Sequence, residues 1–298
     1  MSLQKYLPKK FQNLLPIFAI LGAVLLWGSS FSAMGFVLRE FSPYEVMCFR
    51  LIVAFLCILP FLKKLFPRNY QKGDWKILLP TVLLQPCLYF LFESYALKLT
   101  TSSQAGIISA CVPLMVALAA WVFLSEAINL KTILGLILSI IGVILLTIFQ
   151  SSKGNAANPV LGNILELAAM VCAACNIILI KQLSSRYNTW TLTAMQVIAG
   201  AIFFLPGLKG LIGAASSVWT FNTIALLFFL GSFVSLGAFG LYNYGISKVP
   251  ASKAAIFINL IPVTAVLLGW IILNEALNTK QCVAATVVIV GVFLSNNK

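Results

Sequence analysis

Runs of about twenty apolar residues alternate with short polar breaks along nearly the whole chain. An α-helix rises about 1.5 Å per residue, so about 20 apolar residues cross the hydrocarbon core of a bilayer. The breaks carry turn or charge signals, such as Ser42-Pro43, the basic stretch 63–76 and Val249-Pro250. The pattern predicts ten transmembrane helices, over residues 16–36, 44–62, 77–97, 103–124, 131–149, 160–182, 190–208, 222–246, 252–273 and 279–295.

Composition supports an all-α membrane protein. The 298 residues are 61% hydrophobic and 9% charged, whereas soluble domains are about 45–50% apolar and about 25% charged. A water-soluble fold of this size could not bury so much apolar surface. The chain has no histidine, and its cysteines lie inside apolar runs. Cys172 and Cys175 have the spacing of a redox or zinc motif but no second pair, so we expect neither a metal nor a cofactor.

The basic residues predict how the chain is oriented. The formal net charge is +13, but the lysines and arginines sit in short loops, which argues against nucleic acid as a partner. With the N-terminus inside, the inner segments carry 14 basic residues and the outer loops 5. Because basic residues favour the cytoplasmic side, we expect a multi-pass protein of the bacterial cytoplasmic membrane with both termini cytoplasmic.

The most informative feature is an internal duplication. Residues 95–143 and 244–292, offset by 149, share 15 identities in 49 positions, more than apolar composition alone would give. The matches include Pro113 with Pro262, Trp121 with Trp270, and Glu126 with Glu275. Earlier in each half the echo is fainter, with Leu59-Pro60 against Leu205-Pro206 at an offset of 146. We therefore divide the chain into repeats 1–150 and 151–298, each with five helices.

Five helices per repeat is an odd number, so the second repeat must enter the membrane from the opposite face. This predicts two inverted five-helix repeats related by a pseudo-two-fold axis in the membrane plane, an arrangement that lets two halves exchange conformations in a transporter. Pro113 and Pro262 are predicted near mid-bilayer, at matching places. Interrupted helices at such places indicate the edge of a binding site, although a simple packing kink would explain the prolines too.

Three features together resemble a known family. They are Trp27-Gly28-Ser29-Ser30-Phe31, Arg50 early in the second helix, and the block that occurs twice. The chain resembles EamA-type members of the drug/metabolite transporter superfamily over nearly its whole length. The resemblance implies ten helices in two inverted repeats, and export or import of amino acids and other metabolites. It does not identify a solute.

Ionisable groups inside a membrane are costly, so Arg50, Glu93 and Glu166 are candidate functional residues. The predicted topology places all three at a similar depth, where they could form an ion-pair cluster that either binds substrate or fixes helix register. Gln85, Tyr89 and Glu93 recur every four residues, which indicates one stripe of a helix that faces a cavity. The full candidate substrate-binding set is Trp27, Ser30, Phe31, Arg50, Gln85, Tyr89, Glu93, Pro113, Glu166, Asn176, Tyr242, Asn243, Asn259 and Pro262.

The two repeats differ at several of these positions. Ala173 stands opposite Trp27, Gln196 opposite Arg50, and Tyr242 opposite Glu93. The predicted site is therefore asymmetric, as recognition of a directional solute requires. Glu126 and Glu275 lie at helix ends, each five residues before a lysine, and we interpret them as polar residues that fix helical hairpins.

The predicted function is a secondary transporter that moves a small metabolite, an amino acid or related solute, outward by alternating access. No Gly-rich phosphate loop is present to supply ATP drive, and no His, Asp or Cys cluster indicates an enzyme. The alternatives are a channel or scaffold and, among transporters, a multidrug exporter of lipophilic cations, which a buried Arg50 would disfavour. The expected partners are the lipid bilayer, a small-molecule substrate, protons as a candidate coupling ion, and a second copy of the chain.

Overall fold

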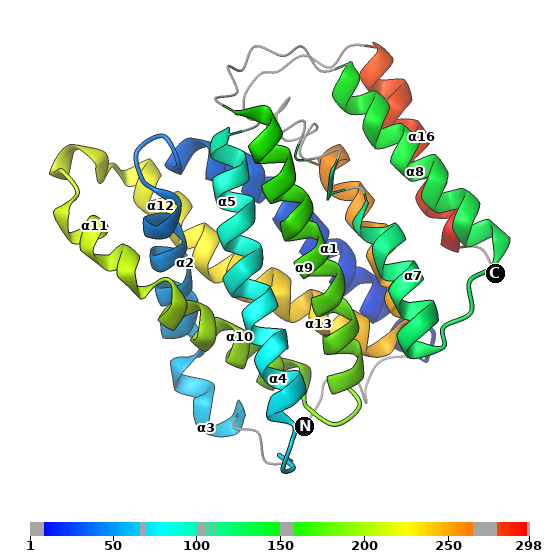
Figure 1. Ribbon diagram of the computed structural model, residues 1–298, viewed down its shortest axis with the longest axis horizontal. Coiled ribbons are helices and arrows are strands. Elements are labelled where there is room, and N and C mark those ends of the chain that lie inside the picture. The colour runs from blue at the N-terminus through cyan, green and yellow to red at the C-terminus, as the bar shows by residue number, and fades with distance from the viewer. Residues whose placement is uncertain are drawn as a thin grey trace.

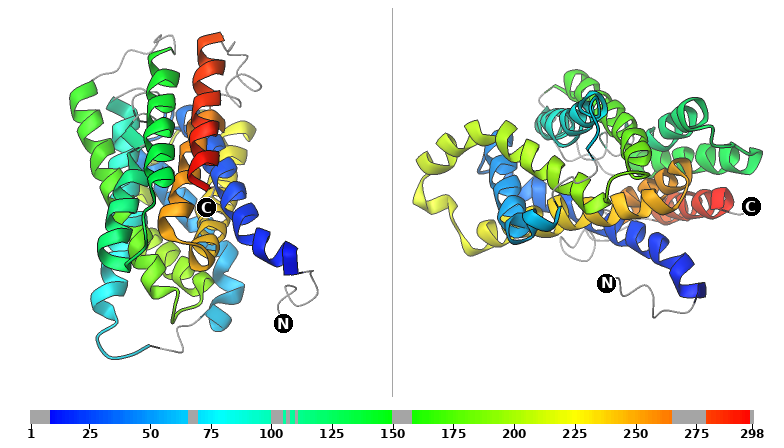
Figure 2. Two further views of the ribbon diagram at one scale, coloured as in Figure 1. Left: turned by 90° about the vertical axis from the view of Figure 1, so that its right-hand side faces the viewer. Right: turned by 90° about the horizontal axis from the view of Figure 1, so that it is seen from below.

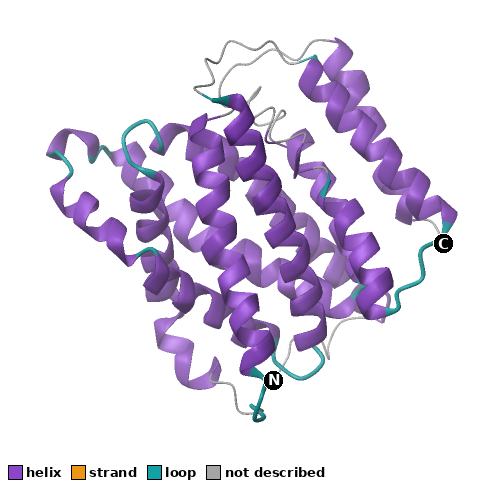
Figure 3. Ribbon diagram, in the orientation of Figure 1, coloured by secondary structure: helices purple, strands orange, loops and turns teal. Residues whose placement is uncertain are grey.

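The computed structural model describes residues 9–65, 70–99, 105, 108–109, 111–149, 158–264 and 279–296. In this part of the chain every regular element is a helix (Figures 1 and 3). The first half contains α1 (Lys9–Val37), α2 (Pro43–Ile58), η2 (Leu59–Phe61), α3 (Leu62–Leu65), α4 (Trp75–Val82), the π-helix η3 (Leu83–Leu88), α5 (Tyr89–Leu99), α7 (Val112–Leu124) and α8 (Leu130–Ile148). The second half contains α9 (Pro159–Leu183), α10 (Thr189–Phe203), η4 (Leu205–Gly207), α11 (Leu208–Gly213), η5 (Ser216–Val218), α12 (Phe221–Phe229), the π-helix η6 (Leu230–Ala238), α13 (Phe239–Lys248), α14 (Ala251–Ile256), η7 (Phe257–Asn259) and α16 (Thr279–Asn296).

These helices match the predicted spans. Five are long and apolar enough to cross a bilayer: Leu14–Val37, Pro43–Leu65, Trp75–Leu99, Val160–Leu183 and Phe221–Lys248. Thr189–Phe203 and Leu205–Gly213 form a further broken span with a bend of 48°. Shorter apolar helices occupy the other four predicted positions, at Val112–Leu124, Leu130–Gly142, Ala251–Thr264 and Cys282–Gly291. The start of predicted span 103–124, the end of 252–273, and Glu275 lie outside the described residues.

The early helices of the two halves begin and end at equivalent positions. Three boundaries are each separated by 146 residues: the ends of α1 and α9 at Val37 and Leu183, the N-caps of α2 and α10 at Ser42 and Asn188, and the N-caps of α4 and α12 at Asp74 and Thr220. The caps explain why the chain starts a helix there. Ser42 forms a reciprocal capping box with Glu45, and the Asn188 side chain accepts the backbone N–H of Trp190 at 2.9 Å.

The last helices, α8 and α16, lie side by side at one edge of the bundle (Figures 1 and 2). Both contain a glycine at the contact. A Cβ built on Gly142 would lie 2.7 Å from the backbone nitrogen of Val288, and one built on Gly291 would lie 2.6 Å from the backbone nitrogen of Ser139. Ser139 and Val288 are also 149 residues apart. Exchanging the two halves therefore turns the contact of Gly142 with Val288 into the contact of Gly291 with Ser139.

That contact fixes the symmetry of the molecule. The C-terminal glycine of each helix meets an earlier residue of the other, so α8 and α16 run antiparallel. A two-fold axis that relates antiparallel helices is perpendicular to them and therefore lies in the plane of the membrane. The chain is thus an all-α membrane protein with ten transmembrane helices in two inverted five-helix repeats, as predicted.

The two halves also exchange packing partners. α1 of the first half packs along α13 of the second, and its equivalent α9 packs along α5. In the same way α2 packs against η6, and α10 packs against η3. Each half therefore encloses the third span of the other, and the space between them is shared.

Those third spans explain why the offset between equivalent residues changes. Trp75–Leu99 has 25 residues, whereas Phe221–Lys248 has 28. Both are irregular in the middle: η3 is a six-residue segment kinked at Gln85, and η6 is a nine-residue π-helix. π-Helical turns insert extra residues into an α-helix and are frequent at functional sites. The additional three residues shift the offset from 146 before this segment to 149 after it.

Candidate functional site

A cavity lies between the two halves. Most of its lining residues lie on α1, α5, α9 and α13, and others lie on α2, η3 and η6. Its lining is Trp27, Ser30, Phe31, Met34, Arg50, Gln85, Tyr89, Phe90, Glu93, Leu97, Ser109, Val112, Met170, Ala173, Asn176, Ile177, Val234, Phe239, Tyr242, Asn243, Ile246, Ile258 and Ile261.

Most of these residues form pairs at equivalent positions of the two halves. The pairs are Trp27/Ala173, Ser30/Asn176 and Phe31/Ile177 at an offset of 146, and Gln85/Val234, Phe90/Phe239, Glu93/Tyr242, Leu97/Ile246, Ser109/Ile258 and Val112/Ile261 at 149. Phe90 and Phe239 also touch each other, with ring centroids 5.7 Å apart. A contact between equivalent residues lies on or beside the pseudo-two-fold axis, so the axis passes through the cavity.

Arg50 is a buried cation that has no carboxylate partner within 4 Å in the described structure. Its side chain is 2% exposed. Nε donates to the Ser235 hydroxyl at 3.1 Å, one terminal nitrogen lies 3.3 Å from the Met34 sulfur, and the guanidinium stacks over Phe90 at 4.8 Å. Thioethers and aromatic faces do not neutralise a guanidinium, so Arg50 keeps an unpaired positive charge at the cavity wall.

Glu93 supplies the opposite charge at the same cavity. Its carboxylate accepts the Tyr89 hydroxyl at 2.5 Å. Gln85, one turn further along this stripe, lies at a kink where its backbone is extended, and its carbonyl accepts Gln196 Nε2 at 3.1 Å. The stripe of Gln85, Tyr89 and Glu93 lines one cavity, although the kink at Gln85 interrupts its helix.

The predicted asparagines line the cavity, but hydrogen bonds between helices use much of their capacity. Asn176 donates to the carbonyl of Thr81 at 2.7 Å, and its oxygen accepts Gln196 Nε2 at 3.3 Å. Asn243 donates to Thr193 and to the Gln196 carbonyl oxygen, both at 3.0 Å. This network ties α9, α10 and α13 to the third span of the first half. It holds the cavity wall in place.

Aromatic side chains complete the wall. Trp27 packs against Tyr242 at 4.9 Å and against Phe239 at 5.4 Å. The buried hydroxyl of Tyr242 has no hydrogen-bond partner. Phe90 was not among the predicted site residues. The sequence signal for it is its identity with Phe239 at an offset of 149, just before the duplicated block 95–143.

Four candidate residues do not line the cavity: Pro113, Glu166, Asn259 and Pro262. Pro113 lies in the first turn of α7, where its missing N–H has no helical partner to lose, rather than in mid-helix. The residues that precede the two prolines, Val112 and Ile261, line the cavity instead. Asn259 is buried on η7, and neither polar atom of its side chain has a partner.

The predicted ion-pair cluster of Arg50, Glu93 and Glu166 is not formed. Arg50 points to Ser235, and neither oxygen of Glu166 has a hydrogen-bond partner. The ion pair that the described residues do form joins Arg186 and Asp74 at 2.7 Å.

Glu126 fixes a helix end, but in the opposite half from its own. Its carboxylate accepts the backbone N–H of Ala251 at 2.7 Å and the N–H and hydroxyl of Ser252. It thereby caps the N-terminus of α14. Lys181 of α9 donates to the carbonyls of Ile246 and Val249 at the end of α13. The α13–α14 connection is held by charges from both halves.

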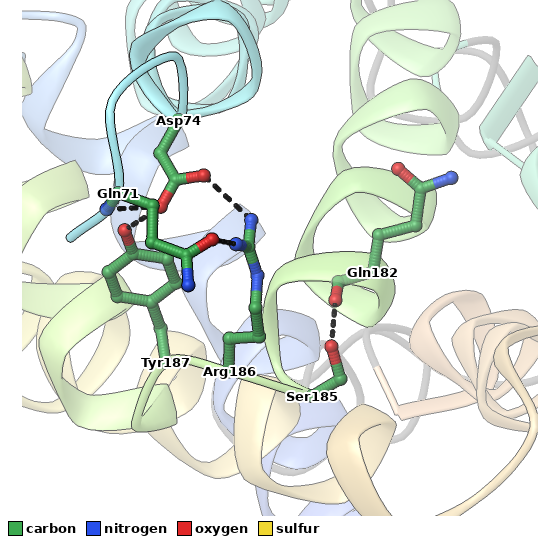
Figure 4. Close-up of polar contacts among 6 residues, drawn as sticks. All are labelled: Gln71, Asp74, Gln182, Ser185, Arg186 and Tyr187. Carbon is green, nitrogen blue, oxygen red and sulfur yellow. Dashed lines mark hydrogen bonds and ion pairs between the residues drawn. The ribbon is translucent and has the colours of Figure 1, made fainter. Parts of the chain in front are cut away.

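One end of the bundle carries a polar contact between the halves, which we name the ionic junction: Gln71, Asp74, Arg186 and Tyr187 (Figure 4). Asp74, before α4, accepts Arg186 at 2.7 Å and the Tyr187 hydroxyl at 2.5 Å. Gln71 donates its backbone N–H to Asp74 and accepts from Arg186. The hydrogen bond from Tyr187, with that of the Gln71 backbone, lowers the pKa of Asp74. Burial and the contact with Asp74 raise the pKa of Tyr187 to about 12.

The opposite end carries an aromatic junction at the equivalent place: Phe41, Phe49 and Trp219. Trp219 lies just before α12, and Gln71 and Asp74 lie just before the equivalent helix α4. Phe41 is the equivalent of Tyr187 at an offset of 146. The ring centroids of Phe41 and Trp219 are 5.0 Å apart, and those of Phe49 and Trp219 are 6.0 Å apart. The sequence analysis did not predict either junction.

Two inverted halves that enclose one mainly apolar cavity with a few polar groups, between end junctions, are the architecture of a membrane transporter with inverted repeats. The model of the EamA-like transporter family matches residues 14–148 and 160–297. The chain therefore belongs to this family of the drug/metabolite transporter superfamily, as its residues suggested.

Similar proteins carry the same description. The chain is 28% identical to the uncharacterized transporter YetK of Bacillus subtilis, over 82% of this chain and 74% of that one. It is 27% identical to an uncharacterized transporter of Archaeoglobus fulgidus over 91% and 95% of the two chains. A WAT1-related chloroplastic protein of Arabidopsis thaliana is 25% identical over 93% and 68%. A solved crystal structure with 17% identity shares the fold at a TM-score of 0.74, over 94% and 96% of the two chains.

Proposed function

We propose that this chain is a secondary transporter that exports an amino acid or a related zwitterionic metabolite by alternating access. The observation that carries the proposal is the charge arrangement of the shared cavity. Arg50 offers unpaired donors to a carboxylate, and Glu93 offers an acceptor to an ammonium group. A solute with both groups would match both residues, and the aromatic wall of Trp27 and Tyr242 would contact an apolar side chain.

The asymmetry at equivalent positions supports a bound solute with a direction. Gln196 replaces Arg50, and Tyr242 replaces Glu93, so each charge of the cavity is present once. The junctions at the two ends of the bundle support alternating access, because opening one while the other stays closed would expose the cavity to one side only. We further propose the bacterial cytoplasmic membrane as the location, repeats divided near residue 150, and the ionic junction on the cytoplasmic side, where basic residues concentrate.

The test is exchange of labelled amino acids by the purified protein in proteoliposomes. Vesicles loaded with an unlabelled amino-acid mixture are diluted into the same mixture carrying radiolabel. We expect uptake above that of empty vesicles. Glu93→Gln should weaken it strongly, since a lost hydrogen bond to a charged group costs about 1.5–3 kcal/mol, roughly a 10- to 150-fold rise in the half-saturating concentration. Arg50→Gln, which copies the residue at the equivalent position, should do the same.

The matched controls are Glu40→Gln and Arg39→Gln, which remove exposed charges near the end of α1 and should leave exchange unchanged. Exchange that survives both cavity variants would contradict the proposal. A transporter of lipophilic cations would behave differently: Arg50→Gln would raise uptake of ethidium, because a repelling charge is removed, and amino acids would not exchange.

A further inference from the structure

Glu166 is a buried acid that the cavity does not use. It lies on α9, with an exposed fraction of 0%, and neither carboxylate oxygen has a hydrogen-bond partner. It sits one turn before Met170 on the stripe of α9 that continues through Ala173 and Ile177, all three of which line the cavity. Glu166 is thus the next position along that stripe, beyond the cavity wall.

The packing of α9 on α5 brings Glu166 level with Glu93. Asn176 of α9 donates to the carbonyl of Thr81, and the backbone N–H of Asn158 donates to the carbonyl of Leu99 at 3.0 Å. The two helices run antiparallel, and in both bonds the numbers of the paired residues add to 257. By that register Glu166 lies opposite residue 91, within about 3 Å of Glu93 along the helix axis. The two carboxyl groups are close enough to interact electrostatically.

The surroundings decide which of the two carboxyl groups is ionised. Glu93 accepts the Tyr89 hydroxyl and feels the charge of Arg50. Glu166 has no hydrogen-bond partner, and the neighbouring charge that acts on it is that of Glu93. An ionised carboxylate without a partner in a low-dielectric interior costs several kcal/mol, and two neighbouring carboxyl groups do not ionise together. Glu93 therefore holds the negative charge, and Glu166 is neutral.

No other charge compensates Glu166 within the described part of the neighbouring helices. The elements packed against α9 are α4, η3, α5, α7, α13 and α14. The charged side chains on or just after α4, α7, α13 and α14 are Lys76, Glu126, Lys248 and Lys253, which belong to the end of the bundle near the C-terminus of α9. On α5 the other charged residue besides Glu93 is Lys98, which lies opposite residue 159 in the same register, roughly 10 Å along the axis from Glu166. Glu166 lies near the opposite end, roughly 10 Å along the helix from the N-terminus of α9.

We propose that Glu166 is a proton-binding site whose occupancy is linked to substrate through Glu93. A substrate ammonium beside Glu93 would offset the negative charge that keeps Glu166 protonated. The O–H bond of Glu166 then breaks, and the proton passes to water when the α5–α9 contact opens. Substrate and proton oppose each other in this scheme, which makes the transport an exchange of one for the other. The linkage rests on the proposed function, whereas the protonation of Glu166 does not.

The first test reads the proton directly, by infrared spectroscopy of the purified protein in lipid at neutral pH. The carbonyl stretch of a protonated carboxylic acid differs from the bands of a carboxylate. We expect this band in the wild-type protein and its loss in Glu166→Gln, a neutral side chain of the same size. Glu40→Gln, which alters an exposed acid, should keep the band. A wild-type spectrum without the band, or a band that survives Glu166→Gln, would overturn the proposal.

The second test separates coupling from transport. Proteoliposomes are given a pH difference across the membrane and labelled amino acids. Glu166→Gln should exchange amino acids at equal pH as the wild type does, but lose accumulation driven by the pH difference. Unchanged accumulation in the variant would overturn the linkage. If the wild type exchanges no amino acid, the proposed function fails, and the infrared result still decides the proton site.

Discussion

The two ends of the bundle carry contacts of different chemistry at equivalent positions. Before α4, Asp74 meets Arg186 and Tyr187 of the α9–α10 connection. Before α12, Trp219 meets Phe41 of the α1–α2 connection. The pseudo-two-fold axis makes the places the same, so the contrast lies in the side chains alone. One junction depends on charge, and the other depends on apolar packing.

The difference matters for the proposed alternating access. In that mechanism, identical junctions would give the states open to either side equal energy. An ionic junction responds to salt and acid, whereas an aromatic one responds to neither. Under the proposal, salt and acid would therefore shift the balance between the two states through one junction only. The α8–α16 contact, by comparison, is symmetric down to its paired glycines.

The largest expected effect comes from the aromatic junction. Phe41 is 2% exposed and packs on Trp219, so Phe41→Ala leaves a cavity that should cost about 3–5 kcal/mol. Thermal unfolding in detergent should show a clear fall in melting temperature. The matched change at the equivalent position, Tyr187→Phe, keeps the ring and removes one hydrogen bond, so its fall should be smaller. The reverse order would show that the aromatic contact is not what holds this end.

The next effect is specific to charge. Asp74→Asn keeps the size of the side chain and removes the ion pair with Arg186. The melting temperature should drop at low salt, and the gap to wild type should narrow as ionic strength rises to about 1 M, where the Debye length is about 3 Å. Trp219→Ala should keep the same gap at all salt concentrations. A salt-independent gap for Asp74→Asn would mean that the ion pair contributes nothing.

The smallest effect is on pH dependence. The pKa of Asp74 is lowered in the fold, so its stabilising contribution is complete above the ordinary aspartate value of about 3.9 and is lost as the pH falls through the lowered pKa. Between pH 7 and about pH 5 the ionic junction should not change. Below about pH 4 the wild type should lose melting temperature faster than Asp74→Asn. Parallel curves down to pH 3 would contradict this assignment.

Much of the fold was predictable because the two halves share identical residues at a constant offset. The offset of 149, the odd number of spans and the depth of Arg50 and Glu93 all followed from hydropathy and identity. The switch between offsets 146 and 149 was visible, but its cause was not. Pro86 marks the break in η3, whereas nothing in the sequence gives the length of the π-helix η6. The contacts of Arg50 with Ser235 and Met34 depend on side-chain direction, which spacing does not give.

The junctions were missed for a different reason. Asp74 and Arg186 are 112 residues apart and lie in loops, where the hydrophobic pattern has no period that predicts contacts. The available signal was the repeat itself, because the offset of 146 pairs Tyr187 with Phe41 and Asp74 with the N-cap Thr220. Comparison of loops, as well as helices, across the two halves would have placed these residues at matching ends.

The most direct test of two unlike junctions around one cavity is to measure access to the cavity from each side. In a variant without native cysteines, Ser30→Cys places one thiol on the cavity wall, and a membrane-impermeant maleimide is added to either side of sealed vesicles. Asp74→Asn should raise labelling only from the side of the ionic junction, and Trp219→Ala only from the opposite side. If either change raises labelling from both sides, or from the wrong side, the junctions do not control access to the cavity.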